Sequence, residues 1–419
     1  MTPDLFINTV LSIFYSFLRE WWWFFAPIIL FFALWSLWGN YIHSKYAQSQ
    51  EWALLEIKIP KLILKTPKAM ENIFSSLHAI STGVSWVDAN FKGKVQNSIS
   101  FEVIGAGGSL HFYIRTLRQF RNFVESQIYS QYSDAEIHEV KDYCMTVPNT
   151  IPDNDYDLWG AEMKLAKEDA YPVRTYEHFE EMVEERRTDP ISSLTEFLAK
   201  LKPGEQIWIQ YVLSPASDSW KEDGVKLVNR LLGKVEEKKP VSVLKILLDI
   251  FLGIITVLSA PSSEAPKSKK DDKKDKSHIA HMSPGEREIV KEIEENIAKL
   301  GFHVAIRFMY VAQKEMFYSH NMAGVVGFFK QFNTLDMNGF AINSASVTAA
   351  GLVLKKTRTF MKKRGMYSKY VHRVASNHFV LNVEELATIF HFPSSATFSP
   401  LLPKIEAKRG EPPAGLPLI

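Results

Sequence analysis

The side chains most often used for catalysis or metal binding are spread thinly along this sequence. His278 and His281 form an H-x-x-H pair, but they stand in a lysine-rich stretch that would not preorganise a metal site. The sequence contains no GxSxG, HExxH or CxxC pattern. Five further histidines have no carboxylate or cysteine partner at a ligand spacing: His303, His320, His372, His378 and His391.

The glycine-rich segment GAGGS at residues 105–109 is a candidate phosphate cradle. It lacks the GxxxxGK(S/T) pattern of a P-loop, and it stands between two alternating apolar segments instead of before a helix. We therefore expect a hairpin turn. The acidic run Glu180, Glu181, Glu184 and Glu185 is typical of a solvated helix face. These patterns argue for no enzyme, no metal and no organic cofactor.

One segment has a charge that stands out. Residues 355–373 carry eight basic side chains and no acidic one, with Phe360, Tyr367 and Tyr370 between them. This composition suits nucleic-acid phosphates and bases, anionic lipid headgroups or an acidic partner, and it also suits a plain solvated surface. The basic residues are Lys355, Lys356, Arg358, Lys362, Lys363, Arg364, Lys369 and Arg373.

The composition limits the number of domains and the class of protein to which these residues belong. The chain has 419 residues, 49 basic and 47 acidic side chains, 46% hydrophobic and 13% aromatic residues. Two or three domains are expected, and fully disordered, collagenous and disulfide-framework classes are excluded. Cys144 is the single cysteine, so no intrachain disulfide can form and a reducing compartment is expected for most of the chain.

Residues 21–38 form an apolar run that is long enough to cross a bilayer. The run WWWFFAPIILFFALWSLW contains no charge over about 18 residues, which span roughly 30 Å as a helix. Pro27 stands inside it. We therefore expect a transmembrane helix over residues 21–42. Aromatic rings at the run's ends match the headgroup level of a membrane: Trp21, Trp22, Trp23, Trp35 and Trp38.

The flanks of this run predict an orientation. Within residues 1–20, Leu5–Leu18 is a second apolar stretch that Arg19 and Glu20 separate from the run, which leaves open an interfacial position or a second crossing of marginal length. Lysines follow the run from Lys45 onward. The positive-inside bias predicts a single crossing of the inner membrane with the body in the cytoplasm.

Residues 52–145 alternate between strand and helix signals. Residues 52–59 alternate as a strand, and Met70, Ile73, Phe74 and Leu77 mark one face of a helix. Two alternating segments around residues 105–108 predict a hairpin, and a capped helix and a last strand follow. The order βαββαβ is that of a ferredoxin-like unit.

A second and less complete copy of this pattern covers residues 155–340. Ser283, Pro284 and Glu286 predict a capped helix start within it. The expected fold is therefore α+β: an N-terminal transmembrane helix followed by two ferredoxin-like units, the second split by an insertion at residues 220–282.

The insertion has two parts. Residues 241–258 are apolar apart from the pair Lys245 and Asp249, which leaves open a packed helix, an interfacial or partner-binding helix, and a less favoured crossing. Residues 260–281 are lysine-rich and without core-forming side chains, so we expect a disordered linker. The basic segment then occupies residues 341–380, and a C-terminal tail covers residues 381–419.

Four long segments carry a resemblance. They are EWALLEIKIPKLILKTPKAMENIFSSLH at 51–78, SFEVIGAGGSLHFYIRTLRQFRNFVESQIYSQYSDAEI at 100–137, VGFFKQFNTLDMNGF at 326–340 and LNVEELATIFHFPS at 381–394. The sequence resembles, over nearly its whole length, a bacterial family: the membrane-anchored amino-terminal region found in or beside ATPases similar to those of type IV secretion and conjugation.

The resemblance implies a role without catalysis. In fused relatives a segment like EAKRGEPPAGLP at 406–417 leads into a motor with a P-loop, whereas this sequence stops at Ile419. It therefore implies a non-catalytic subunit that recruits or orients a separate ATPase at the cytoplasmic face of the membrane. A membrane-tethered nucleic-acid-binding module is the alternative. Membrane lipid and a P-loop ATPase are the expected partners, and DNA and further copies of the chain are left open.

The tail offers a candidate contact with that ATPase. Residues 381–394 combine a short amphipathic turn with aromatic side chains ahead of Pro393, a composition suited to docking in a groove. The alternative is that the same residues close the core of the second unit. The candidate contact residues are Leu386, Ile389, Phe390 and Phe392.

Overall fold

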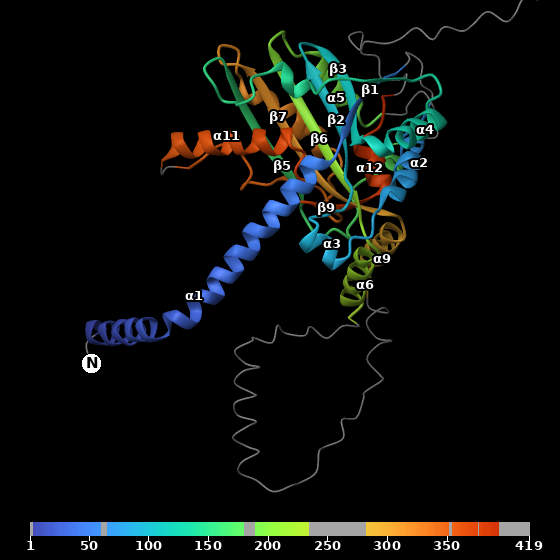
Figure 1. Ribbon diagram of the computed structural model, residues 1–419. Helices are drawn as coiled ribbons and strands as arrows, with labels where there is room; N and C mark the ends of the chain where they lie inside the picture. Colours follow the sequence, from blue (N-terminus) through green and yellow to red (C-terminus); the bar gives the residue numbers. More distant parts are fainter. Residues whose placement is uncertain are drawn as a thin grey trace, which may run out of the picture.

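The computed structural model describes residues 3–59, 65–179, 189–233, 282–351, 354–375 and 377–393 (Figure 1). The expected apolar helix at 241–258, the expected linker at 260–281 and the tail beyond residue 393 lie outside the described residues.

The strands form one antiparallel sheet of nine strands. Its order is β4-β1-β3-β2-β6-β7-β5-β8, with β9 also paired to β7. The central strands β2, β6 and β7 are buried at almost every residue, because successive side chains point to opposite faces of the sheet and both faces are covered. The strands are β1 (Trp52–Lys58), β2 (Ile99–Ala106), β3 (Ser109–Leu117), β4 (Glu136–Glu139), β5 (Tyr156–Leu165), β6 (Glu205–Pro215), β7 (Gly301–Gln313), β8 (Phe340–Ile342) and β9 (Phe379–Asn382).

The expectation of a transmembrane helix followed by two ferredoxin-like units is wrong as a description of this fold. The two halves of the chain share one continuous sheet, because β2 pairs with β6 along its whole length, from Ile99 opposite Leu213 to Ala106 opposite Gln206. One hydrophobic core also takes in residues from both halves. Alternation predicted the strands, but it carries no information on which strand lies beside which.

Five of the described helices contribute residues to this core. The predicted apolar face of the first of them is confirmed, since Met70, Ile73, Phe74 and Leu77 are all buried. These helices are α2 (Lys68–Leu77), α4 (Arg121–Gln131), α5 (Ser192–Ala199), α10 (Met322–Lys330) and α12 (Val383–Ile389). Figure 1 shows α2, α4 and α12 side by side against the sheet.

The opposite face is covered by α11 (Lys355–Val371), whose residues Met366, Tyr367 and Tyr370 are buried against the sheet. At one end of the molecule, α6 (Ser219–Leu231) and α9 (Pro284–Ile297) pack on each other around a small core of their own (Figure 1). The capped start predicted for α9 is confirmed, because Ser283 and Glu286 form a capping box with Pro284 in the first turn.

The N-terminal helix α1 (Pro3–Ser49) is 47 residues long and projects from the body (Figure 1). Among the described residues, no helix combines the length and hydropathy needed to span a membrane, so the predicted single-pass transmembrane helix is corrected. The apolar run is the middle of a longer helix that continues through Arg19 and Glu20. Tryptophan side chains prefer the boundary between water and hydrocarbon to the hydrocarbon interior, so the tryptophans of this run do not favour a position inside a bilayer. Near its other end it contacts α3 (Trp86–Phe91), where Trp38 Nε1 donates to the Asn90 carbonyl at 3.2 Å.

Candidate functional site

A row of buried polar side chains crosses the sheet beneath α11. Glu102 on β2 lies opposite Gln210 on β6, Gln210 lies opposite Arg307 on β7, and Arg307 lies opposite Glu162 on β5. Directly opposed residues of neighbouring strands point to the same face of a sheet. The four side chains therefore form a line perpendicular to the strands, and each is at most 2% exposed.

The chain segment just after α11 supplies the main partner of this row. Arg373 N donates to the Tyr370 carbonyl and Val374 N donates to the Lys369 carbonyl, both at 3.0 Å, which is the Schellman arrangement at a helix end. Arg373 has a φ of 52°, in the left-handed region where glycine is favoured. An arginine in this backbone conformation is strained, and the contacts of its side chain offset the strain.

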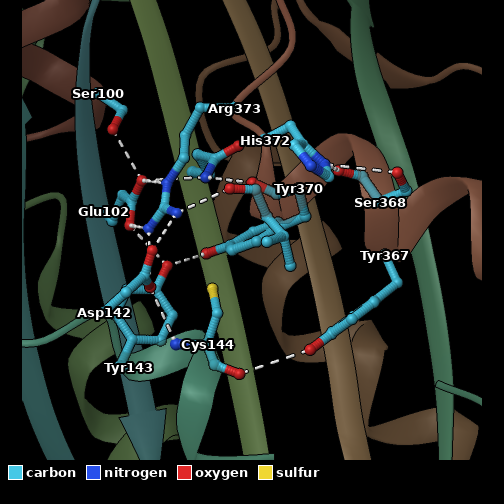
Figure 2. Close-up of polar contacts among 12 residues, drawn as sticks. Ser100, Glu102, Asp142, Tyr143, Cys144, Tyr367, Ser368, Tyr370, His372 and Arg373 are labelled. Atoms are coloured by element: carbon cyan, nitrogen blue, oxygen red, sulfur yellow. Dashed lines mark hydrogen bonds and ion pairs between the residues drawn. The ribbon is translucent and has the colours of Figure 1, made fainter. Parts of the chain in front are cut away.

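The guanidinium of Arg373 lies between two carboxylates (Figure 2). Arg373 Nε and Nη2 donate to Glu102 at 3.0 and 3.1 Å, and Arg373 Nη2 also donates to Asp142 at 3.1 Å. Glu102 further accepts hydrogen bonds from Tyr143 at 2.6 Å, Ser100 at 2.7 Å and Gln210 at 3.0 Å. Every one of these donors stabilises the ionised form of Glu102.

The titration of these groups follows from this geometry. Burial by itself would raise the pKa of Glu102, but the charge and hydrogen bonds of Arg373 outweigh it, so this pKa is lowered. The pKa of Asp142 is lowered for the same reasons, with help from the Cys144 amide. Burial would lower the pKa of Arg373, yet the Glu102 charge raises it above its ordinary value. The three groups are therefore held as a charged set.

Arg307 makes a second connection between the sheet and the end of α11. Its guanidinium donates to the carbonyl oxygens of Lys369 and Val374, and it lies 3.6 Å from Glu162. Gln210 Nε2 adds a hydrogen bond of 3.2 Å to the Tyr370 carbonyl. A cation at the C-terminus of a helix also stabilises the helix dipole. Burial lowers the pKa of Arg307, and the Glu162 charge opposes this shift.

We call Arg373, Arg307, Glu102 and Asp142 the α11 lock. Aromatic rings pack beside the lock. Tyr143 OH lies 2.8 Å from Tyr370 OH, and both rings pack against Trp208. Burial raises the pKa of the Cys144 thiol beside them, which keeps it in the unreactive thiol form. The charges of the lock are paired, and three of its four side chains (Arg373, Arg307 and Glu102) are buried, which is typical of a structural connection.

The family model of a domain of unknown function, DUF8128, matches residues 43–400. The chain belongs to the DUF8128 family. The matched region takes in all nine strands, α11 and the four residues of the lock, and it leaves out most of α1. The sheet and its lock are therefore parts of the DUF8128 domain itself. Comparison with curated proteins gives no match.

The basic segment predicted from the sequence is divided by the DUF8128 fold into two groups. Lys362 donates to the carbonyls of Val347 and Ala349, Lys363 pairs with Asp157 at 2.6 Å, Lys369 lies 3.7 Å from Glu162, and Arg373 belongs to the lock. The other group is exposed and has no ion pair with the described residues: Lys355, Lys356, Arg358 and Arg364.

The tail residues proposed for docking are in the core. Leu386, Ile389, Phe390 and Phe392 are each at most 1% exposed. The Phe390 ring packs against Phe101, with the ring centroids 5.0 Å apart. The structure thus shows the alternative interpretation, in which these residues close the core, and they offer no surface to a partner.

The aromatic residues of the apolar run lie on α1. Trp22, Trp23, Trp35 and Trp38 are 63%, 61%, 38% and 46% exposed, and the side chain of Trp21 lies outside the described part.

The glycine-rich segment is a hairpin turn between β2 and β3, as predicted. Gly107 and Gly108 have φ values of 55° and 87°, which two-residue hairpin turns require. Among the described residues, no group of three or more His, Cys, Asp or Glu side chains could hold a metal ion. His278 and His281 lie outside the described residues.

The lock and one buried pair of a histidine and an aspartate were not predicted from the sequence. His391 Nε2 lies 2.7 Å from Asp189, a partner 202 positions away along the chain. Glu102 and Arg307 are the charged residues of two strands that are otherwise mostly apolar. These charges could have indicated the lock, because a charge on a buried strand needs a buried partner.

Proposed function

We propose that this DUF8128 protein is a non-catalytic scaffold subunit of a larger assembly, and that its partner is a separate P-loop ATPase of the type IV secretion or conjugation class. The partner class rests on the family resemblance of the sequence. The scaffold role rests on the exposed apolar surface of α1.

That surface is large and continuous. The apolar residues of α1 that are between 59% and 67% exposed include Ile29, Leu30, Phe31, Phe32, Leu34 and Leu37. At 3.6 residues per turn, positions this close together point to all sides of a helix. Trp86 and Phe91 of α3 continue the surface where α1 meets the body, at 66% and 54% exposed. Apolar patches of this extent mark an interaction surface, so we infer that α1 is covered in the working molecule.

The body suits a scaffold because its elements are tied together over long sequence distances. The continuous sheet and the α11 lock fix the surfaces of the protein relative to one another. A scaffold needs such rigidity to hold a partner in one orientation.

Co-purification tests this proposal. The wild-type chain is expressed with the P-loop ATPase encoded nearest to it, and the two are expected to purify together. Changing Phe31 and Phe32 to Ser is expected to abolish co-purification. The matched control changes Tyr129 and Val225 to Ser, since these are apolar residues of the body with 42% and 43% exposure. Retention of the ATPase by the α1 variant, or its loss from the control, contradicts the proposal.

A further inference from the structure

The N-terminal half of α11 is a projecting basic helix, and we call its residues Lys355, Lys356, Arg358, Phe360 and Arg364 the α11 arm. The lock holds the other end of the helix on the sheet. Figure 1 shows the arm extending beyond the strands of the sheet. Its position is thus set by the fold, while its side chains remain available to a partner.

The N-terminal end of α11 carries positive charge, although helix N-termini favour negative charge. Lys355 and Lys356 stand at the first positions of α11, and its first turn contains no acidic residue. Cations are unfavourable at a helix N-terminus, where the free N–H groups and the helix dipole already produce positive potential. A break in a local rule of this kind is expected where function requires it. The combined field of the dipole and the basic side chains favours an anion such as a phosphate.

The arm also presents a flat aromatic surface. The Arg364 guanidinium lies over the Phe360 ring, 4.7 Å from its centroid, and Phe360 is 43% exposed. Stacked arginine and aromatic planes are what nucleic-acid bases pack on, in addition to the phosphate contacts that basic side chains make.

We propose that the α11 arm binds nucleic acid, with Lys355, Lys356 and Arg358 on the phosphates and the Arg364–Phe360 pair on the bases. An acidic protein surface would use the same charges but would gain little from the stacked pair. This inference stands apart from the proposed ATPase partner, because it rests on α11 and that proposal rests on α1.

Fluorescence anisotropy tests this inference on the full chain. The probes are a labelled duplex DNA, a single strand of the same sequence and a labelled poly-glutamate peptide. The arm variant changes Lys355, Lys356 and Arg358 to Ala. The matched control removes the same charge from scattered exposed positions, by changing Lys141, Lys200 and Lys330 to Ala. Circular dichroism melting of each variant checks folding, and salt is varied between about 50 and 200 mM.

The wild type is expected to bind the single strand more tightly than the duplex, because the Arg364–Phe360 pair can stack only on unpaired bases. The arm variant is expected to lose at least about tenfold in affinity, and its slope of log K against log salt is expected to fall by about 2–3. The control is expected to keep its affinity within about twofold, while Phe360→Ala weakens binding without changing the slope. Absence of DNA binding, equal losses in arm variant and control, or tighter binding of poly-glutamate than of DNA would each overturn the inference.

Discussion

Arg373 and Glu102 are 271 positions apart in the sequence, yet they are joined by two hydrogen bonds of 3.0 and 3.1 Å inside the protein. Glu102 belongs to the central strand β2, and Arg373 lies two residues beyond the last residue of α11. This pair therefore connects the middle of the sheet to the helix that carries the basic arm. The Arg373 side chain is 3% exposed and that of Glu102 is 0% exposed, so solvent screens their interaction little.

Removing Arg373 should cost much of the stability of the domain. Arg373→Ala leaves Glu102 and Asp142 buried without their cation, and breaking a buried pair from one side costs about 3–5 kcal/mol. The free energy of unfolding, measured by urea denaturation, should fall by this amount. Arg364→Ala is the control, because Arg364 is an exposed arginine within α11 and its removal should cost at most about 0.5 kcal/mol. Equal losses for the two variants would show that the lock contributes nothing special.

The lock should also make stability depend on pH in the acid range. The folded-state pKa values of Glu102 and Asp142 lie below their ordinary values of 4.5 and 3.8, so the folded state binds fewer protons than the unfolded state. The stabilisation is fully present above the ordinary values and is lost as the pH falls through the folded-state values. Unfolding measured from about pH 7 to about pH 3 should show this loss in the wild type and a smaller one in Arg373→Ala. Parallel curves would contradict it.

Truncation of the tail aromatic should affect folding before binding. Phe390→Ala removes a ring that packs among Phe101, Phe112 and Tyr211 in the core, and such changes cost about 3–5 kcal/mol. A lower melting temperature is expected. An unchanged melting temperature together with loss of partner binding would contradict this prediction and would indicate that Phe390 contacts a partner.

The purified chain should neither hydrolyse ATP nor bind it saturably. The sequence has no P-loop lysine and no glycine-rich loop before a helix, which are the features that cradle nucleotide phosphates. Phosphate release and titration with a fluorescent nucleotide measure this. Activity that follows the protein through successive purification steps would contradict the proposed non-catalytic role.

Local patterns predicted local structure well and long-range partners poorly. The spacing of Met70, Ile73, Phe74 and Leu77 gave the buried face of α2, and Ser283 with Glu286 gave the start of α9. These signals act within one or two turns of chain. The pairing of β2 with β6, which unites the halves, depends on strands far apart in sequence. The same limit hid the lock, because Arg373 looked like one more member of a basic run until the fold placed Glu102 beside it.

Hydrogen–deuterium exchange of α11 tests the central structural claim, that the lock holds this helix on the sheet. In the wild type the amides of residues 366–371 should exchange slowly, because Met366, Tyr367 and Tyr370 are buried against the sheet. In Arg373→Ala these amides should exchange markedly faster while those of β2, β6 and β7 stay protected. Equal exchange of α11 in the two proteins, under conditions where both remain folded, would contradict the account.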